Sequence, residues 1–268
     1  MIKTLKELYK YRELLFSLVR KSLKARYKGS FLGFLWTFIN PLMRLLIYAF
    51  VFQVVFRVQI PNYTMLLFTA LLPWANFSST LNSGMTSVVD NSSLVKKVYF
   101  PRIILPISIS LTYTIDFIYC VPILIAAMFI THLPFNRWIL FFPVVLVLQF
   151  LYQTGISFAI SAINVRFRDT KQILGLITMA WFYFTPILFK LDMLPETASI
   201  LGMEVYPRIL LTIINPMTGI INGYRAAFFY GAPPDPASIL ISAAEAIIAF
   251  VVGMAIFRKM EKTFAEDL

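Results

Sequence analysis

Residues 20–41 read RKSLKARYKGSFLGFLWTFINP, and the character of the chain changes in the middle of this stretch. The part before Gly29 is rich in lysine and arginine, whereas the part after it is apolar and aromatic. This pattern is typical of a helix that lies in the headgroup region of a membrane and is followed by a helix that enters the bilayer. The stretch therefore predicts which end of the protein faces the cytosol, and the remaining topology follows from it.

The composition indicates an integral membrane protein. Hydrophobic residues make up 59% of the 268-residue chain, and the mean hydropathy is +0.76, whereas soluble domains are about 45–50% apolar. Several apolar stretches are long enough to cross a bilayer, which takes about 20 residues. The single Cys120 and the single His132 exclude a disulfide framework and a His/Cys metal site.

The predicted fold is all-α, with one transmembrane domain over residues 1–268. It begins with an amphipathic interfacial helix in residues 1–30, continues with six membrane spans in residues 31–257, and ends with a cytosolic tail, residues 258–268. The predicted spans are residues 31–56, 64–89, 103–130, 138–165, 172–189 and 237–257. On the interfacial helix, Arg12 and Arg26 interrupt an otherwise apolar face, and Lys28 lies on the opposite, basic face.

The apolar run between the fifth and sixth spans, residues 209–230, is long enough for a seventh span. However, Pro216 interrupts it, and Arg225 would be buried within it. A seventh span would also place the basic residues of the tail outside. We therefore expect two short re-entrant helices on the outer side, over about residues 207–230, because each half is too short to cross the membrane.

The distribution of lysine and arginine supports this topology. The predicted cytosolic side holds 18 of these residues, the outer side holds five, and Arg44 lies inside the first span. Cytosolic loops of membrane proteins carry such an excess of basic residues. The charge of +11 is thus explained without a nucleic-acid partner, and both termini are predicted to be cytosolic.

Four segments resemble a known family. They read RKSLKARYKGSFLGFLWTFINPL from residue 20, LVKKVYFPRIILP from residue 94, NVRFRDTKQIL from residue 164 with FTPILF from residue 184, and NPMTGIINGYRAAFF from residue 215. In this order they look like the membrane-entry segment, the cytosolic coupling segment, the region between the fourth and fifth spans, and the outer re-entrant segment of a family of permeases. That family is the membrane subunits of type-2 ABC exporters for bacterial surface polysaccharides such as O antigen, capsule and teichoic acid.

The resemblance implies a homodimer in the bacterial inner membrane, surrounded by lipid, with a path for lipid-linked polysaccharide between the two subunits. It also implies two separate ATP-binding cassette subunits on the cytosolic face, which would carry ATP and Mg. The chain itself contains no GxxxxGK[ST] phosphate loop. It is therefore expected to be a transporter subunit rather than an enzyme, with no cofactor of its own.

The predicted coupling contact to the ATPase is Lys96, Lys97, Val98, Tyr99, Phe100, Pro101 and Arg102. Val98, Tyr99 and Phe100 would place apolar bulk on a cytosolic loop, and an exposed aromatic cluster rimmed by charge is typical of a docking surface. Alternatively, the loop only sets topology by its charge, and Pro101 starts the next helix. A second cytosolic group, Arg166, Arg168 and Asp169, either pairs locally or contacts the ATPase.

A substrate path is predicted along one face of the first span. Its residues, at steps of four, are Asn40, Arg44, Tyr48 and Phe52. A charge at the centre of a bilayer costs about 2.5–3.5 kcal/mol on insertion scales, so Arg44 should face protein, water or the headgroups. Arginine binds phosphate well, and aromatic rings suit sugars. Trp181 and Phe184 form a second candidate stripe. The alternatives are a subunit-packing face and a lipid-facing belt.

The resemblance also implies an outer gate near Pro216, Tyr224 and Arg225. Asp116 and Glu245 are the remaining charges in the spans, and each carboxyl is expected to be either neutral or paired with Arg44 or Arg225. There are three alternative functions: a small-molecule or drug exporter on the same scaffold, a membrane-embedded lipid- or sugar-modifying enzyme using Asp116, His132 or Glu245, and a proton-coupled secondary transporter. The scattered carboxylates disfavour the enzyme, and the lack of an internal repeat disfavours the secondary transporter.

Overall fold

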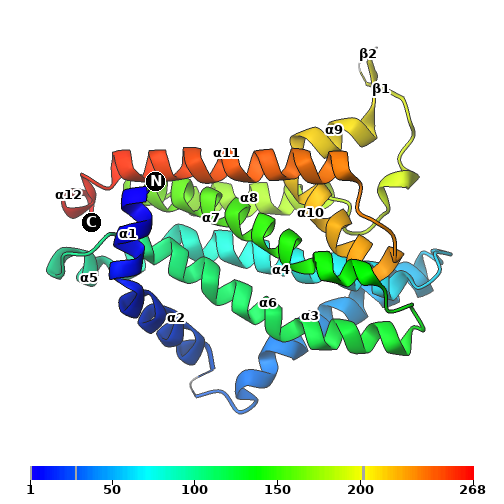
Figure 1. Cartoon of the computed structure of the whole chain (residues 1–268), viewed down its shortest axis with the longest axis horizontal. Coiled ribbons are helices and arrows are strands. Elements are labelled where there is room, and N and C mark those ends of the chain that lie inside the picture. Colours follow the sequence, from blue (N-terminus) through cyan, green and yellow to red (C-terminus); the bar gives the residue numbers. More distant parts are fainter. Residues whose placement is uncertain (1, 28, 201–202) are drawn as a thin grey trace.

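The computed structural model describes residues 2–27, 29–200 and 203–268, so the prediction for Lys28 lies outside the described residues. Long helices run side by side along the molecule (Figure 1). The most extensive contacts join α7 (Phe142–Arg166) to α11 (Pro236–Met260), and α4 (Tyr63–Thr86) to both α6 (Ile104–Ile130) and α7. These four helices form the centre of the bundle.

Four helical segments among the described residues are long and apolar enough to cross a membrane. They are Gly33–Val55, Ile104–Ile130, Arg137–Arg166 and Pro236–Met260. The first combines a 3₁₀ turn, Gly33–Leu35, the helix α3 (Trp36–Ala49) and a π-helical segment, Phe50–Val55. The third begins with a 3₁₀ helix, Arg137–Phe141. These segments correspond to the predicted first, third, fourth and sixth spans.

The predicted second and fifth spans do not have this simple apolar character. The helix α4 has 24 residues, but it carries buried polar side chains such as Asn76 and Thr80. The helix α8 (Thr170–Tyr183) has only 14 residues, about 21 Å at 1.5 Å per residue. It ends six residues before the predicted boundary at residue 189, and a hydrocarbon core is about 30 Å thick.

The N-terminal segment differs from the single helix that the sequence predicts. It forms two helices, α1 (Ile2–Lys10) and α2 (Arg12–Tyr27). Gly29 and Gly33 have φ angles of +78° and +48°, which glycine adopts without the steric cost that a Cβ would add. The chain therefore turns sharply between the basic helix and the apolar one.

The segment between α8 and α11 contains the two predicted short helices and one unexpected element. The helices are α9 (Pro207–Ile214) and α10 (Pro216–Arg225), and a π-helical turn, Ala226–Tyr230, follows α10. Before them, β1 (Ala198–Ile200) and β2 (Met203–Val205) form an antiparallel hairpin. The all-α prediction missed this hairpin, which follows a 3₁₀ turn, Leu191–Met193.

The two ends of the bundle carry different elements. Both termini, α1 and α5 (Ser92–Lys97) lie at one end, together with the short C-terminal helix α12 (Phe264–Asp267), whereas the hairpin and α9 lie at the other end (Figure 1). A 3₁₀ turn, Val89–Asn91, leads into α5. A separate hydrophobic core, which we call the terminal core, joins elements at the first end. Its buried residues include Leu18, Val95, Phe100, Val165, Phe257 and Phe264.

Candidate functional site

The predicted coupling segment combines exposed and buried residues. Lys96 and Lys97 occupy the last turn of α5, where cations interact favourably with the helix dipole. Val98 is extended and 50% exposed, and Tyr99 is 95% exposed. Phe100 is only 6% exposed. The expectation that all three apolar residues form an exposed cluster is therefore wrong for Phe100.

Phe100 is an anchor because it belongs to the terminal core with Phe257 and Phe264. Burying a Phe side chain contributes about 1.5–3 kcal/mol. Pro101 then starts the turn that leads into α6, and its carbonyl oxygen accepts a hydrogen bond from the Ile104 N–H at 3.1 Å. Val98 and Tyr99 therefore form the exposed tip of this segment, and the neighbouring Phe100 is buried in the terminal core and supports them.

Arg102 contacts the C-terminal tail of its own chain. Its guanidinium donates a hydrogen bond to the carbonyl oxygen of Glu261 and lies 5.9 Å from the ring centre of Phe264. Burial raises the pKa of the Glu261 carboxyl above its ordinary value, and the guanidinium groups of Arg102 and Arg258 offset part of that rise. Arg102 therefore joins the predicted coupling segment to the C-terminal tail.

The second cytosolic group lies on the connection from α7 to α8. Arg166, Arg168 and Asp169 are all exposed, and the Arg166 guanidinium lies 5.9 Å from the ring centre of Phe167. In the described part of the chain, no ion pair joins Asp169 to either arginine. Val165 belongs to the same terminal core as Phe100, so the two exposed segments lie at the same end of the bundle.

The four residues of the predicted first-span stripe do not share one environment. Asn40 and Arg44 line a cavity of about 380 Å³ between α3, α4 and α6. Tyr48 lines a second hollow, of about 340 Å³, and its ring centre is 5.9 Å from that of Phe182 on α8. Phe52 packs on Tyr63, with ring centres 6.0 Å apart.

The second predicted stripe, Trp181 and Phe184, is divided as well. The Trp181 indole N–H donates to Asn215 Oδ1 at 2.8 Å, and its ring packs against Phe77 in the bundle. Phe184 is 65% exposed. Trp181 therefore anchors the chain before α10, whereas Phe184 lies on the surface.

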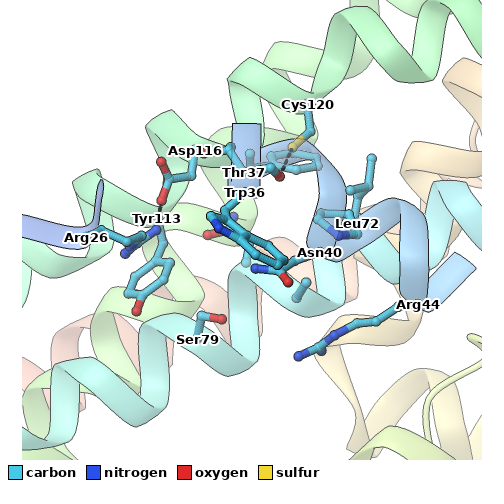
Figure 2. A pocket seen from close by; sticks show the side chains of 14 residues that line it. Arg26, Trp36, Thr37, Asn40, Arg44, Leu72, Ser79, Tyr113, Asp116 and Cys120 are labelled. Carbon is cyan, nitrogen blue, oxygen red and sulfur yellow. Dashed lines mark hydrogen bonds and ion pairs between the residues drawn. The ribbon is translucent and has the colours of Figure 1, made fainter. Parts of the chain in front are cut away.

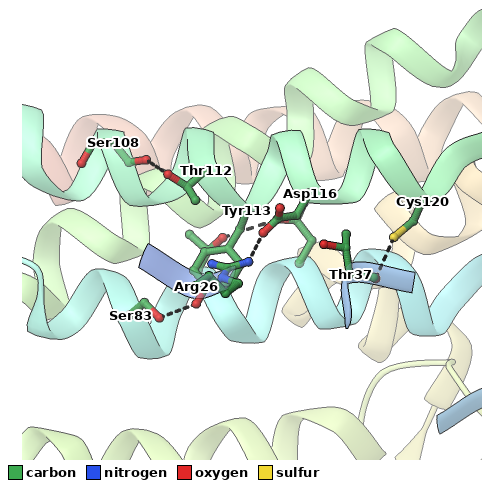
Figure 3. Close-up of polar contacts among 10 residues, drawn as sticks. Arg26, Thr37, Ser83, Ser108, Thr112, Tyr113, Asp116 and Cys120 are labelled. Carbon is green, nitrogen blue, oxygen red and sulfur yellow. Dashed lines mark hydrogen bonds and ion pairs between the residues drawn. The ribbon is translucent and has the colours of Figure 1, made fainter. Parts of the chain in front are cut away.

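An ion pair near the larger cavity was not predicted. The Arg26 guanidinium pairs with the Asp116 carboxylate and lies 4.3 Å from the ring centre of Tyr113 (Figures 2 and 3). The Tyr113 hydroxyl is in turn 2.7 Å from Ser83 Oγ on α4. The proposed partners of Asp116, Arg44 and Arg225, are therefore wrong. The interruption of the apolar face of α2 by Arg26 was the sequence feature that could have indicated this pairing.

The predicted gate residues are part of the protein interior. The Tyr224 hydroxyl donates to Gln149 Oε1 at 2.7 Å, and the Arg225 guanidinium donates to the carbonyl oxygens of Ile187 and Phe189 at 3.0 and 3.1 Å. The exposed fractions of Tyr224 and Arg225 are 1% and 0%. Pro216 begins α10. Movement of this segment as a gate stays a prediction.

Asn215 organises the break between α9 and α10. Its side-chain oxygen accepts from the Met217 N–H at 3.1 Å and from Trp181, and its amide donates to the Phe184 carbonyl at 3.0 Å and to Thr185 Oγ1 at 2.8 Å. The side chain is 4% exposed. Sequence reasoning attributed this break to Pro216 and missed the asparagine before it.

The residues considered for acid/base chemistry lie on different elements. Asp116 is within α6, His132 follows the end of α6 with a φ of +53°, and Glu245 is within α11. Within residues 2–27, 29–200 and 203–268, no group of three or more His, Cys, Asp and Glu side chains could hold a metal ion.

The class of protein is shown by the sequence of the chain. Residues 13–229 match the family described as ABC-2 type transporter, and the chain belongs to this family. It is the membrane permease component of a transporter, as the sequence predicts.

Named relatives match over nearly the whole chain. An O-antigen export system permease protein RfbA from Myxococcus xanthus is 35% identical over 272 residues, covering 100% of both chains. A protein of the same name from Klebsiella pneumoniae is 36% identical, covering 96% of this chain and 95% of the relative. The polysialic acid transport protein KpsM from Escherichia coli is 21% identical, covering 92% and 93%.

Proposed function

We propose that this permease exports a lipid-linked, O-antigen-like polysaccharide across the bacterial inner membrane. The observation that carries the proposal is the 35% identity, over the full length of both chains, to a permease named for O-antigen export. A more distant relative is named for transport of another polysaccharide, polysialic acid. These names favour a glycan over the small molecule or drug of the alternative hypothesis.

The proposed topology has six spans, with both termini in the cytosol. The termini and the basic N-terminal helices share one end of the bundle (Figure 1), and the predicted cytosolic segments hold 18 of the 24 lysine and arginine residues. The helix α4 would span within protein, because several of its polar side chains, such as Asn76 and Thr80, are buried against its neighbours. The helix α8 would span together with residues 184–189, and α9 and α10 would be re-entrant from the outside.

The proposed assembly is a homodimer bound to two ATP-binding cassette subunits, which carry ATP and Mg. Tyr99 and Val98 form the exposed apolar tip for ATPase docking, with Lys96 and Lys97 beside it. Arg166 and Arg168 lie at the same end and would extend this contact. The glycan would pass between the two subunits, next to the cavity that Asn40 and Arg44 line within each subunit.

Export is tested in a strain from which the gene is deleted. We expect loss of polysaccharide from the cell surface and accumulation of lipid-linked polysaccharide inside, with both reversed by the wild-type gene. Tyr99→Ala should fail to restore export, whereas Tyr206→Ala, an exposed tyrosine next to the hairpin at the opposite end, should restore it. A deletion strain with normal surface polysaccharide and an altered efflux of a small molecule would overturn the proposal.

A further inference from the structure

The cavity between α3, α4 and α6 lies within one subunit, next to the end of α2. Its volume of about 380 Å³ is within the range of about 300–1,000 Å³ that is typical of ligand sites. Arg26 and Arg44 lie at two separate places along its wall, with Trp36 and Asn40 between them (Figure 2). The site therefore brings the last turn of the basic helix α2 together with the charged residue of the first span.

The lining is rich in hydrogen-bond donors and carries a net positive charge. Arg26 and Arg44 contribute two guanidinium groups, and Asp116 is the one acidic residue among the lining residues. In the described part of the chain, Arg44 makes no hydrogen bond or ion pair, so its donors remain available to a ligand. Guanidinium groups bind phosphate oxygens in pairs of parallel hydrogen bonds.

A buried donor without a partner points to the same kind of ligand. Asn76, on α4, lines the cavity and is 5% exposed, and its Nδ2 has no hydrogen-bond partner among the described residues. Its Oδ1 is already an acceptor for Thr80 and Gln153. A buried donor of this kind is unfavourable unless an acceptor is supplied. A phosphate group has several such oxygens.

The ion pair between Arg26 and Asp116 can be exchanged for a ligand. The Arg26 side chain is 33% exposed, whereas the Asp116 side chain is 11% exposed, so an incoming group can reach the guanidinium. Arginine has five donors, and a phosphate carries more negative charge than one carboxylate. A phosphate group can therefore compete with Asp116 for the Arg26 guanidinium.

Apolar groups complete the wall. Leu72, Phe117 and the ring of Trp36 face the same space. A free inorganic anion would leave these surfaces uncovered, whereas a phosphate attached to a lipid chain would contact both kinds of lining.

We propose that this cavity binds the phosphate or diphosphate head of a lipid, with Arg44, Asn76 and Arg26 as donors and with Asp116 as the competitor that the head displaces from Arg26. This inference rests on the proposed function, since a lipid-linked glycan is the natural source of such a head. Two ligands carry the phosphate or diphosphate group that this site would bind. One is the head of a lipid, and the other is a free diphosphate in solution.

Binding is measured by calorimetric titration of the purified full-length permease in a non-ionic detergent. The three probes are farnesyl diphosphate, inorganic pyrophosphate and farnesol. We expect farnesyl diphosphate to bind more tightly than farnesol, and Arg44→Gln to weaken that binding by about tenfold or more, because a charge-assisted hydrogen bond is lost. Arg57→Gln, an exposed arginine outside the cavity, is the matched control and should bind as the wild type does.

Asp116→Asn provides a test in the opposite direction. Because the competing carboxylate is removed, this variant should bind farnesyl diphosphate about tenfold more tightly. A folding defect would weaken binding, so tightening cannot come from damage. Pyrophosphate binding as tight as that of farnesyl diphosphate assigns the site to a free anion, and weaker pyrophosphate binding assigns it to a lipid. Equal binding of farnesol and farnesyl diphosphate, or unchanged affinity in both variants, would overturn the proposal.

The titration separates this inference from the proposed function. It uses the permease alone and needs no ATPase and no glycan. If the variants bind as the wild type does while surface polysaccharide is lost on gene deletion, the export function stands and the site is refuted. If the site binds as expected and the deletion leaves surface polysaccharide intact, the export function fails and the site stands.

Discussion

The Arg102 guanidinium donates a hydrogen bond to the backbone carbonyl oxygen of Glu261, which lies 159 residues further along the chain. This contact joins the segment after α5 to the C-terminal tail, and the ring of Phe264 packs beside it. The exposed tip of Val98 and Tyr99 is therefore supported by both the start of α6 and the last residues of the chain.

The tail should stabilise the end of the bundle that carries α5. Phe264 is 1% exposed and its ring centre is 5.4 Å from that of Phe257. Truncating a buried Phe to Ala typically costs about 3–5 kcal/mol. We expect Phe264→Ala to lower the thermal unfolding midpoint of the purified permease clearly. Phe135→Ala, which is 63% exposed, should leave the midpoint nearly unchanged, and equal midpoints for the two variants would contradict this account of the tail.

Adjacent aromatic residues of the coupling segment should behave differently. Phe100→Ala removes a side chain from the terminal core and should lower the unfolding midpoint, because a cavity is left. Tyr99→Ala changes a side chain that is 95% exposed and should change the free energy of unfolding by no more than about 0.5 kcal/mol. Thermal unfolding in detergent compares the two directly. An unfolding midpoint for Phe100→Ala equal to that of the wild type would show that the buried position assigned to Phe100 is wrong.

Asn215 should hold the segment between α9 and α10. Asn215→Ala would leave the Trp181 indole N–H and the Met217 N–H without this acceptor, and such losses cost about 1–3 kcal/mol per buried group. We expect a lower unfolding midpoint and a changed tryptophan emission spectrum. Asn82→Ala, which removes one exposed hydrogen bond to the Ser78 carbonyl, is the control, and it should have a much smaller effect on both readings.

The contact between α7 and α11 at Gly155 and Gly253 should tolerate no added methyl group. A Cβ at Gly253 on α11 would overlap the carbonyl group of Gly155 on α7, and a Cβ at Gly155 would overlap the backbone of Ala249 and Phe250. Small residues allow such close approach of membrane helices. We expect Gly253→Ala to reduce the yield of folded protein and its unfolding midpoint.

The matched control for this contact is Gly175, which lies in α8 with open space around the added Cβ. Gly175→Ala should be neutral or slightly stabilising, because Ala is favoured over Gly in a helix by up to about 1 kcal/mol. If both glycine variants are equally stable, the close packing of α7 and α11 is wrong.

The sequence predicted those features that depend on neighbouring residues. Apolar runs identified the long helices, Gly29 marked the turn after the basic helix, and Pro216 marked the break before α10. These predictions succeed because the number of apolar residues needed to cross a membrane and the backbone conformations of Gly and Pro depend only on the local sequence.

Features that depend on distant residues were missed. Arg26 and Asp116 are 90 residues apart, and although Arg26 interrupts an apolar face, its local sequence does not identify Asp116 as its partner. Phe100 was expected on the surface, because burial by the C-terminal tail cannot be read from the loop itself. The strands β1 and β2 have only three residues each, and the alternation of polar and apolar residues that identifies a strand needs about four to eight residues.

We propose that a separate ATP-binding subunit drives this permease and docks on the exposed tip beside α5. The direct measurement is co-purification, in detergent, of the permease with the ATP-binding cassette subunit of the same organism. The account predicts that the wild type and Tyr206→Ala retain the ATPase, and that Tyr99→Ala loses it while its unfolding midpoint is unchanged. Failure of the wild-type permease to retain any ATP-binding subunit would contradict the account.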